Sequence, residues 1–353
     1  METPGRGHGK PVKVGLFLTN QHPIGSDVVA GQRDQIEMFR FARDAGWDSV
    51  FAGQHYLTEG MAMPQPIPFL SRIAAESEDM AVGLGIMLLT LYNPVDAAEQ
   101  VASLDITTDG RFIFGVGLGY REAENNAFGV ANNQRVRRFT KNLDIVTRLL
   151  AGESVTADLP WCRLDDAKLT APPVQQPRPP IWIAADADKA VRRAARLADT
   201  WMINPHATVD TIVRQLAMFR EERASEGLPP ASEIPLMREV FCAPTRAEAA
   251  NLALPYLEKK YQVYSSWGQD KALPGDESFV IPIEALEKDR FVVGTPDDCI
   301  AQLLPWRTTA GVDHFIFRTH WSGMPAEVAL ASMKLLNDEV LPVVLAASGP
   351  PPP

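Results

Sequence analysis

The sequence has few cysteines and no long hydrophobic run. Its cysteines are Cys162, Cys242 and Cys299, which lie far apart and form no CxxC pair. Scattered cysteines in odd number are typical of reduced thiols in a cytoplasmic protein rather than of a disulfide frame or a zinc site. No stretch reaches the roughly 20 apolar residues of a membrane span, and residues 1–11 lack the apolar run of a signal peptide. These absences predict a cytoplasmic protein with no membrane partner.

Basic residues are outnumbered by acidic ones. The 353 residues include 34 Lys and Arg against 44 Asp and Glu, which gives a formal net charge of −10. Proteins that bind nucleic acid use clustered Lys and Arg to neutralise its phosphates, so this negative net charge argues against a nucleic-acid partner. The hydrophobic fraction of 46% is enough to fill the interior of one large domain and to cover one face of its outer helices.

Several common catalytic signatures are also absent. There is no GxSxG elbow and no GxxxxGK phosphate loop. No lysine lies at a predicted strand end, which argues against a Schiff-base aldolase. Four histidines could in principle surround a metal, but no clear carboxylate accompanies them, so we predict no metal site. These histidines are His22, His55, His206 and His320.

What the chain does contain is a regular alternation of short apolar runs and longer helical patterns. Eight runs predict strands at residues 12–20, 49–55, 80–89, 111–119, 180–186, 200–204, 234–243 and 313–319. Amphipathic patterns predict helices at 32–45, 95–107 and 134–150, and others that begin near residues 66, 188, 208, 245, 296 and 325. Eight strand–helix units without antiparallel hairpin signals predict a parallel sheet closed into a (β/α)₈ TIM barrel, with a doubly wound open sheet as the alternative.

Both ends and two internal segments interrupt this pattern. Residues 1–11 and the Pro-rich residues 344–353 are predicted to be disordered tails around a single domain of residues 12–343. Residues 153–179 are Pro-rich and form an insertion after the fourth strand, with one short strand predicted at 161–168. Residues 265–290 form a second insertion between strands seven and eight; they are polar and lack a clear period, which is typical of an active-site lid.

Polar side chains cluster at the predicted carboxyl ends of the strands, where α/β barrels place their active sites. Polar residues are common at strand ends in any protein, so the cluster is a stronger indication than any single member. Four of the six histidines fall in this cluster. Its members are Asn20, His22, Gln54, His55, Tyr56, Asn93, Tyr120, Arg121, Asp186, Asn204, His206, His320 and Trp321.

The fourth predicted strand carries glycines at alternate positions, Gly115, Gly117 and Gly119. Tyr120 stands where a Rossmann GxGxxG motif requires its last glycine, so that fingerprint is excluded. The period of two places the glycines on one strand face. There, the missing side chains allow either a flat ligand or a neighbouring element to approach the backbone.

Taken together, these segments resemble the luciferase-like superfamily of flavin-dependent oxidoreductases, which includes bacterial luciferase, alkanesulfonate monooxygenase and deazaflavin-dependent dehydrogenases. The resemblance covers about residues 12–340, and each motif stands at the expected barrel element. The matching segments are 48–56, 93–94 with 104–105 and 110–112, 115–119, 180–183 with 198–199, and 294–296.

The resemblance implies roles for individual residues. His55 matches the family histidine implicated in catalysis, whereas Gln54 and Tyr56 stand where the family has an acid and often a second histidine. Gly85 and Ile86 align with a site that often carries a non-proline cis peptide behind the flavin ring. The other implied contacts are Asn93, Tyr120 and Arg121 for the cofactor, and Tyr56, His320 and the lid residue Trp267 for the substrate.

The cofactor phosphate is expected after the fifth strand, where the N–H groups of a helix terminus favour an anion. Family members commonly have small residues and a serine there, whereas this chain has Ala185 followed by Asp186. An aspartate repels a phosphate, so we interpret Asp186 or Asp188 as the N-cap of the next helix. Arg121 and Lys189 could restore the positive charge.

The resemblance also implies an oxidoreductase. In the favoured interpretation, a separate flavin reductase supplies reduced FMN (FMNH₂), which with O₂ oxidises a small organic substrate through a peroxide on the flavin. In the alternative, a deazaflavin exchanges hydride with an alcohol or alkene. Residues 54–59 end in a Thr-Glu pair similar to luciferase-type monooxygenases, which favours FMN. The polar strand ends disfavour a non-catalytic flavin-binding protein, and the family resemblance implies a homodimer.

Overall fold

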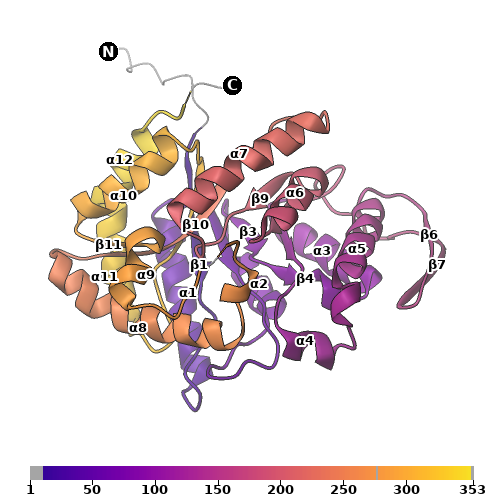
Figure 1. The fold of residues 1–353 in the computed structure, drawn as a ribbon. Coiled ribbons are helices and arrows are strands. Elements are labelled where there is room, and N and C mark those ends of the chain that lie inside the picture. Colours follow the sequence, from indigo (N-terminus) through magenta and orange to yellow (C-terminus); the bar gives the residue numbers. More distant parts are fainter. Residues whose placement is uncertain (1–10, 276, 351–353) are drawn as a thin grey trace.

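A computed structural model describes residues 11–275 and 277–350, which fold around a curled parallel sheet (Figure 1). The spatial order of its strands is β11-β10-β12-β1-β2-β3-β5-β8-β9, and β4 pairs with β5. The strands are β1 (Lys13–Leu18), β2 (Ser49–Ala52), β3 (Ala81–Leu84), β4 (Met87–Leu88), β5 (Phe112–Gly117), β8 (Ile181–Ala184), β9 (Thr200–Met202), β10 (Pro235–Cys242), β11 (Phe291–Gly294) and β12 (His314–Arg318).

The sheet curls until its two ends touch. Ile203, directly after β9, forms a parallel bridge with Leu236 of β10. The backbone N–H of Ile203 donates to Pro235 O at 3.2 Å, and the N–H of Met237 donates to Ile203 O at 2.8 Å. The first half of β10 pairs with β12 and its second half with β11. The carboxyl ends of the parallel strands therefore gather at one end of the curl.

Helices lie around the outside of the strands (Figure 1). None of the helices in the described part of the chain is long and apolar enough to cross a membrane. Proline stands in the first turn of α2, α3 and α10, where its missing N–H is not needed. The helices are α1 (Val28–Asp44), α2 (Pro66–Ala74), α3 (Pro94–Thr107), α4 (Glu122–Ala127), α5 (Arg135–Leu150), α6 (Asp188–Leu197), α7 (Val209–Ser225), α8 (Arg246–Ser266), α9 (Ile283–Arg290), α10 (Pro296–Thr308), α11 (Ala326–Leu335) and α12 (Leu341–Ala346).

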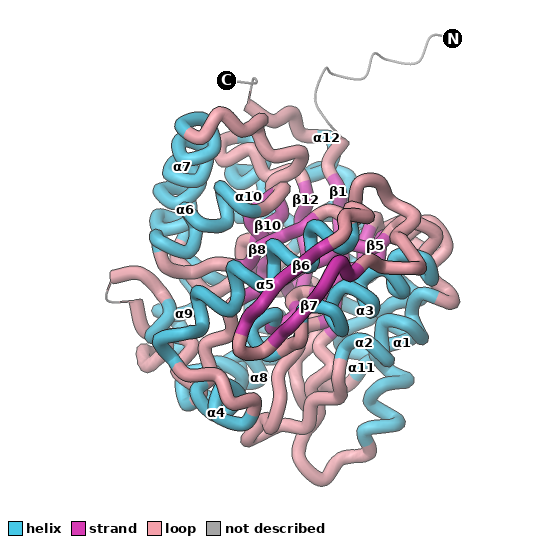
Figure 2. Tube along the Cα trace, turned by 90° about the vertical axis from the view of Figure 1, so that its right-hand side faces the viewer, coloured by secondary structure: helices cyan, strands magenta, loops and turns pink. Residues whose placement is uncertain are grey.

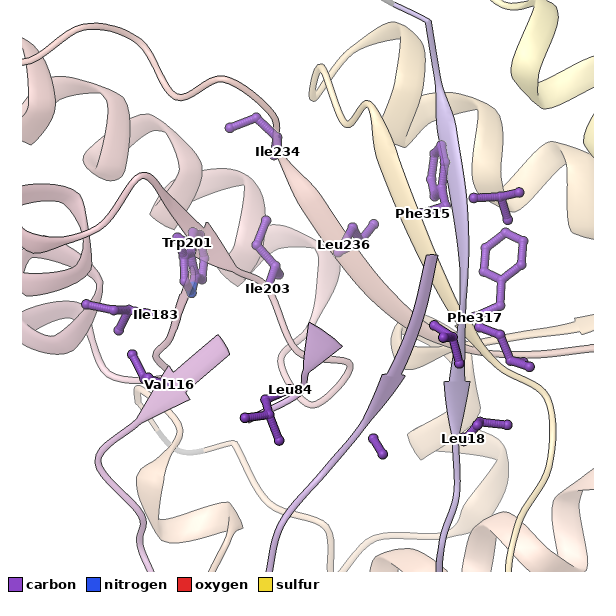
Figure 3. Packing of buried hydrophobic residues seen from close by; sticks show 14 of the residues in the cluster. Leu18, Leu84, Val116, Ile183, Trp201, Ile203, Ile234, Leu236, Phe315 and Phe317 are labelled. Carbon is purple, nitrogen blue, oxygen red and sulfur yellow. The ribbon is translucent and has the colours of Figure 1, made fainter. Parts of the chain in front are cut away.

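The period of two along the strands separates two apolar compartments. In β1, Leu16 and Leu18 belong to the large cluster that packs against the outer helices, whereas Phe17 belongs to a small cluster inside the curl. The large cluster draws on strands all round the sheet, as Leu84, Ile183 and Phe317 illustrate in Figure 3. The small cluster contains Phe17, Phe51, Ile113, Trp182, Met202, Met237 and Ile316.

The structure confirms each predicted strand and nearly every helix start, and corrects the segments between them. Residues 80–89 form two strands, β3 and β4, rather than one. Residues 153–179 contain an antiparallel hairpin of β6 (Val155–Leu159) and β7 (Cys162–Ala167). Strand β7 confirms the short strand predicted at 161–168, whereas β6 was not predicted. This hairpin lies next to α5 at the outside of the molecule (Figures 1 and 2). Strand β6 escaped prediction because it has alternate exposed residues and no apolar run.

The second insertion is more ordered than the sequence suggests. Helix α8 continues to Ser266 and α9 begins at Ile283, so regular helix occupies both ends of residues 265–290. The short strand β11 follows directly and was missed, because its four residues stand alone before the next helix. Helix α12 reaches Ala346, beyond the predicted domain end at 343. Of the predicted tails at residues 1–11 and 344–353, residues 1–10 and 351–353 lie outside the described residues.

Candidate active site

A cavity of about 420 Å³ lies at the carboxyl ends of the strands. Its apolar lining includes Phe17, Met202 and Met237, which belong to the inner cluster. The segment after α8 contributes Gln269 and Leu273 to the wall. Six of the residues expected to act in catalysis or to contact the cofactor line the cavity: His55, Gly85, Ile86, Tyr120, Ala185 and Asp186. Gln54, Asn204 and His206 of the predicted strand-end cluster line it as well.

His55 is held in place by a buried carboxylate. Its Nδ1 lies 2.9 Å from Oε1 of Glu124, a residue of α4 that is 1% exposed. The same oxygen accepts the backbone N–H of Tyr56 at 2.9 Å and Nη1 of Arg121 at 3.1 Å. Although burial acts to raise the pKa of Glu124, these partners hold it below the ordinary value. Glu124 is therefore ionised at neutral pH and accepts a hydrogen bond from Nδ1, which leaves Nε2 of His55 to act in the cavity.

Arg121 connects this pair to Trp267, the residue that follows α8. It donates to the backbone oxygens of Tyr56 at 2.5 Å and Leu57 at 3.2 Å. Its guanidinium lies 4.3 Å from the centre of the Trp267 ring, a cation–π contact. The ring of Trp267 is 5.2 Å from that of His55. Arg121 and Trp267 thus pack against the pair of His55 and Glu124. Neither residue lines the cavity, so Arg121 is not placed as a cofactor ligand.

Gln54, which stands where the family has an acid, links the end of β2 to β4 through hydrogen bonds. Its Oε1 accepts the backbone N–H of Leu88 in β4 at 2.9 Å. Its Nε2 donates to the hydroxyls of Tyr56 at 3.0 Å and Tyr92 at 2.5 Å. The residue is only 3% exposed, so an uncharged amide suits the position better than a carboxylate.

A cis peptide joins Gly85 to Ile86, as the resemblance implies. It lies between β3 and β4, and both residues line the cavity. The glycines of β5 make room for this segment: a Cβ on Gly115 would stand 1.8 Å from Leu84 O, and one on Gly117 would stand 1.9 Å from Cδ1 of Ile86. Of the two explanations for these glycines, the neighbouring element is therefore the one that the structure supports.

The opposite wall of the cavity offers donors to an anion. Ala187 is the N-cap of α6, and its side chain accepts none of the first N–H groups of the helix. Arg135 and Arg193 line the cavity, and the Nε atom of each is buried without a hydrogen-bond partner in the described part of the chain. A helix N-terminus with two such arginines is suited to a phosphate.

Asp186 does not cap this helix, so the N-cap interpretation was wrong. Its carboxylate accepts from Nδ2 of Asn204 and, at 3.3 Å, from Nε2 of Gln269. Burial raises the pKa of Asp186 to about 6. Asp188 lies in the first turn and pairs with Arg214 at 2.7 Å.

A sequence model of the luciferase-like monooxygenase family matches residues 12–314. The chain belongs to this family. The 4-hydroxyprotoasukamycin monooxygenase of Streptomyces nodosus subsp. asukaensis is 24% identical over 298 residues, 82% of this chain and 80% of the relative. The F420-dependent glucose-6-phosphate dehydrogenase of Amycolatopsis mediterranei is 25% identical over 328 residues, 88% of this chain and 94% of the relative. The relatives of this protein thus include a monooxygenase and an F420-dependent enzyme.

Solved structures share the fold. The monooxygenase RslO1 from Streptomyces bottropensis superposes with a TM-score of 0.82 at 24% identity and covers 94% of this chain and 99% of its own. The oxygenating constituent of 3,6-diketocamphane monooxygenase from Pseudomonas putida, in complex with FMN, gives a TM-score of 0.77 at 19% identity over 94% of this chain and 98% of its own.

The residues of this luciferase-like family member fit a phosphorylated flavin or deazaflavin. The unpartnered Nε atoms of Arg135 and Arg193 supply buried donors for a phosphate. The small side chains of Ala184 and Ala185 leave the approach to α6 open. Asp186 is hydrogen-bonded to Asn204 and Gln269, and because burial raises its pKa to about 6, its carboxyl opposes an anion only above that pH.

Besides Arg121 and Trp267, three more predicted contacts lie away from the cavity: Asn93, Tyr56 and His320. Asn93 caps α3, where its Oδ1 accepts the N–H of Val95 at 2.9 Å, and together with Tyr56 it lines a separate cavity of about 390 Å³. His320 is buried, and both of its ring nitrogens are in use. Its Nδ1 pairs with Gln35 at 3.1 Å, and its Nε2 pairs with Met324 O at 2.8 Å. None of the three lines the main cavity.

The sequence analysis missed several side chains of the site. Glu124 lies in a short helix with no apolar pattern, so no signal marked it. Arg135 and Arg193 belong to helices whose charged faces are ordinarily solvated. Arg318 ends β12 and lines the cavity; its position at a strand end was the available signal. Arg135 and Arg193 line the cavity, whereas the expected Arg121 and Lys189 do not.

Proposed function

We propose that the protein is a monooxygenase that uses reduced FMN and O₂ to oxidise a small organic substrate. The observation that carries the proposal is His55 at the cavity wall, with Nδ1 held by the buried carboxylate of Glu124 at 2.9 Å. Similarity to the monooxygenase of Streptomyces nodosus also supports it. When bound, reduced FMN would supply the electrons that activate O₂.

Residues of the protein itself bind the phosphate, exclude water and transfer a proton. Arg135, Arg193 and the N-terminus of α6 bind the phosphate. Phe17 and Leu88 exclude water from the reacting atoms. His55 holds or moves a proton at Nε2, because an imidazole can do both near neutral pH.

A hydride-transfer enzyme with a deazaflavin is the second candidate. Similarity to the F420-dependent glucose-6-phosphate dehydrogenase of Amycolatopsis mediterranei favours it. The two candidates predict different ligands and different demands for O₂, so binding and oxygen consumption separate them.

Titration of the purified full-length protein tests the choice. Absorbance and protein fluorescence are followed with FMN, with FMNH₂ under anaerobic conditions, and with F420. Binding of FMNH₂ supports the monooxygenase, whereas tight binding of F420 without binding of either flavin contradicts it. His55→Ala is the matched control, because this variant should retain cofactor binding and lose turnover.

The organisation around the site completes the proposal. Residues 12–346 form one (β/α)₈ barrel domain in which part of 265–290 acts as a lid. A separate flavin reductase supplies FMNH₂ to a homodimer. Light scattering on the purified protein tests the dimer, and an assay with and without a purified flavin reductase tests the two-component scheme.

A further inference from the structure

The cavity has a second cationic end, which the cofactor phosphate does not need. Arg318 is the last residue of β12 and lines the cavity. Strands β1, β2, β3 and β5 separate β12 from β8, the strand that leads to the phosphate end. On a curled sheet these two strands lie across from each other. Arg318 is therefore available to a group other than the phosphate.

Arg318 is buried with unused hydrogen-bond donors. It is 5% exposed, and its guanidinium lies 4.3 Å from the centre of the Phe17 ring. Its Nε and Nη1 atoms have no hydrogen-bond partner within residues 11–275 and 277–350. The nearest carboxylate, Glu239, forms an ion pair with Arg318 at 3.7 Å but accepts no hydrogen bond from it. Buried N–H donors that lack an acceptor are destabilising. A ligand that accepts from Arg318 would remove this penalty.

The carboxylate that faces Arg318 is already occupied. In Glu239, Oε1 accepts from Nζ of Lys260, and Oε2 accepts from Nε1 of Trp321 at 2.6 Å. Oε1 lies 3.7 Å from Nη1 of Arg318, which is too far for a hydrogen bond. Lys260 and Arg318 thus share one carboxylate, and of these two cations only Lys260 is hydrogen-bonded to it. The free donors of Arg318 therefore define the site.

His206 lines the same cavity and adds a neutral polar group. Its Nδ1 is buried without a partner in the described chain. Burial, together with the charges of Lys260 and Arg318, lowers the pKa of His206 well below its ordinary value. The ring is therefore neutral at physiological pH and can donate one N–H to an acceptor.

The surroundings of these donors are apolar. Phe17, Met202 and Met237 line the cavity and belong to the inner apolar cluster. A charged group on an apolar body matches this combination, because the charge meets Arg318 while the body meets the apolar side chains. The ligand chemistry that fits is an organic acid.

We propose that Arg318 binds the carboxylate of a small organic acid, and that this acid is the substrate. The assignment of the acid as substrate rests on the proposed function, whereas the binding site itself does not. Carboxylate oxygens accept from guanidinium N–H groups at short distance, and these charge-assisted hydrogen bonds are stronger than bonds between neutral groups.

Calorimetric titration of the full-length protein, with and without FMN, tests the site. The probes are acetate, benzoate and phenylacetate, each compared with its neutral amide. We expect at least one acid to bind about tenfold or more tightly than its amide. Arg318→Met should abolish this preference, and Arg318→Lys should retain part of it. Arg246→Met is the matched control, because Arg246 pairs with Asp298 at the surface and should not affect the preference.

Three results would overturn the proposal: no preference for any acid in the wild-type protein, an unchanged preference in Arg318→Met, or a loss of FMNH₂ affinity in that variant with the preference intact. The last result would assign Arg318 to the reduced flavin ring. If Arg318→Met does not fold, the wild-type preference and its reduction in Arg318→Lys decide. A protein that prefers acids and binds neither FMN nor F420 would contradict the proposed function and leave the acid site standing.

Discussion

The Nδ1 atom of His55 lies 2.9 Å from Oε1 of Glu124, although 69 residues separate the two along the chain. A carboxylate only accepts hydrogen bonds, so it selects the tautomer with the hydrogen on Nδ1. The free lone pair of the neutral ring is then on Nε2. This arrangement places a base, His55, beside a carboxylate that orients it, which is a typical arrangement for general acid–base catalysis.

Glu124→Gln should lower kcat about 10- to 100-fold, because an amide can donate as well as accept and no longer selects one tautomer. His55→Ala should lower kcat about 10²–10⁴-fold. Product formation and oxygen consumption at saturating substrate measure both effects. Glu222→Gln, which alters a surface ion pair with Arg192, is the control. If the losses add fully in the double variant, Glu124 does not act through His55.

This pair also shows how far the sequence could lead. His55 could be found because strand-end position and motif are local properties. Glu124 could not, because α4 contains both Glu122 and Glu124 within six residues, and only packing decides which is buried. Glu122 is exposed and Glu124 is not. The identity of the acid depends on how the loop after β5 folds back onto β2.

The same distinction between local sequence properties and tertiary packing applies to the fold. Apolar runs located the strands of the parallel sheet except β11, and missed the break between β3 and β4. These runs are visible because periodicity is a local property. Asp186 was misassigned as a cap because the start of α6 falls one residue later, at an Ala187 cap with extended dihedral angles. The sequence favours Asp over Ala at a cap, but the tertiary contacts of Asp186 with Asn204 and Gln269 override that preference.

Arg193→Met should weaken the binding of FMN about 10- to 100-fold and leave riboflavin binding unchanged. The buried Nε of Arg193 has no partner among the described residues, and a hydrogen bond to a charged group contributes about 1.5–3 kcal/mol. Fluorescence titration with each flavin measures the two affinities. Arg192→Met is the matched control, because Arg192 is adjacent in the same helix but pairs with Glu222 at the surface. Equal losses for FMN and riboflavin would exclude a phosphate contact.

Asp186→Asn should strengthen FMN binding at pH 8 about tenfold and have little effect at pH 5. Burial raises the pKa of Asp186 to about 6, so the carboxyl is neutral below that pH and repels the phosphate above it. The phosphate also gains charge near pH 6, so the ratio of the wild-type and variant dissociation constants is the quantity to compare. A ratio that does not change with pH would place Asp186 too far from the phosphate to act on it.

His320 makes the stability of the protein depend on pH below neutrality. Burial lowers the pKa of His320 to about 4, against 6.5 in the unfolded chain. Above pH 6.5 the ring is neutral in both states, and as the pH falls toward 4 only the unfolded state takes up the proton. The folded state thus loses about 3 kcal/mol of stability across this window, since each pH unit contributes about 1.4 kcal/mol.

His320→Gln should remove this part of the acid sensitivity, because the amide does not titrate and can still donate to Met324 O, which accepts from Nε2 at 2.8 Å in the wild-type protein. Urea unfolding at pH 7 and pH 4.5 measures the free energy of unfolding for both proteins. The difference between the two pH values should be smaller in the variant by about 2–3 kcal/mol. An identical difference in both proteins would mean that His320 titrates alike in the folded and unfolded states, with Met324 O still accepting from Nε2 and Gln35 turned so that its Oε1 accepts from Nδ1.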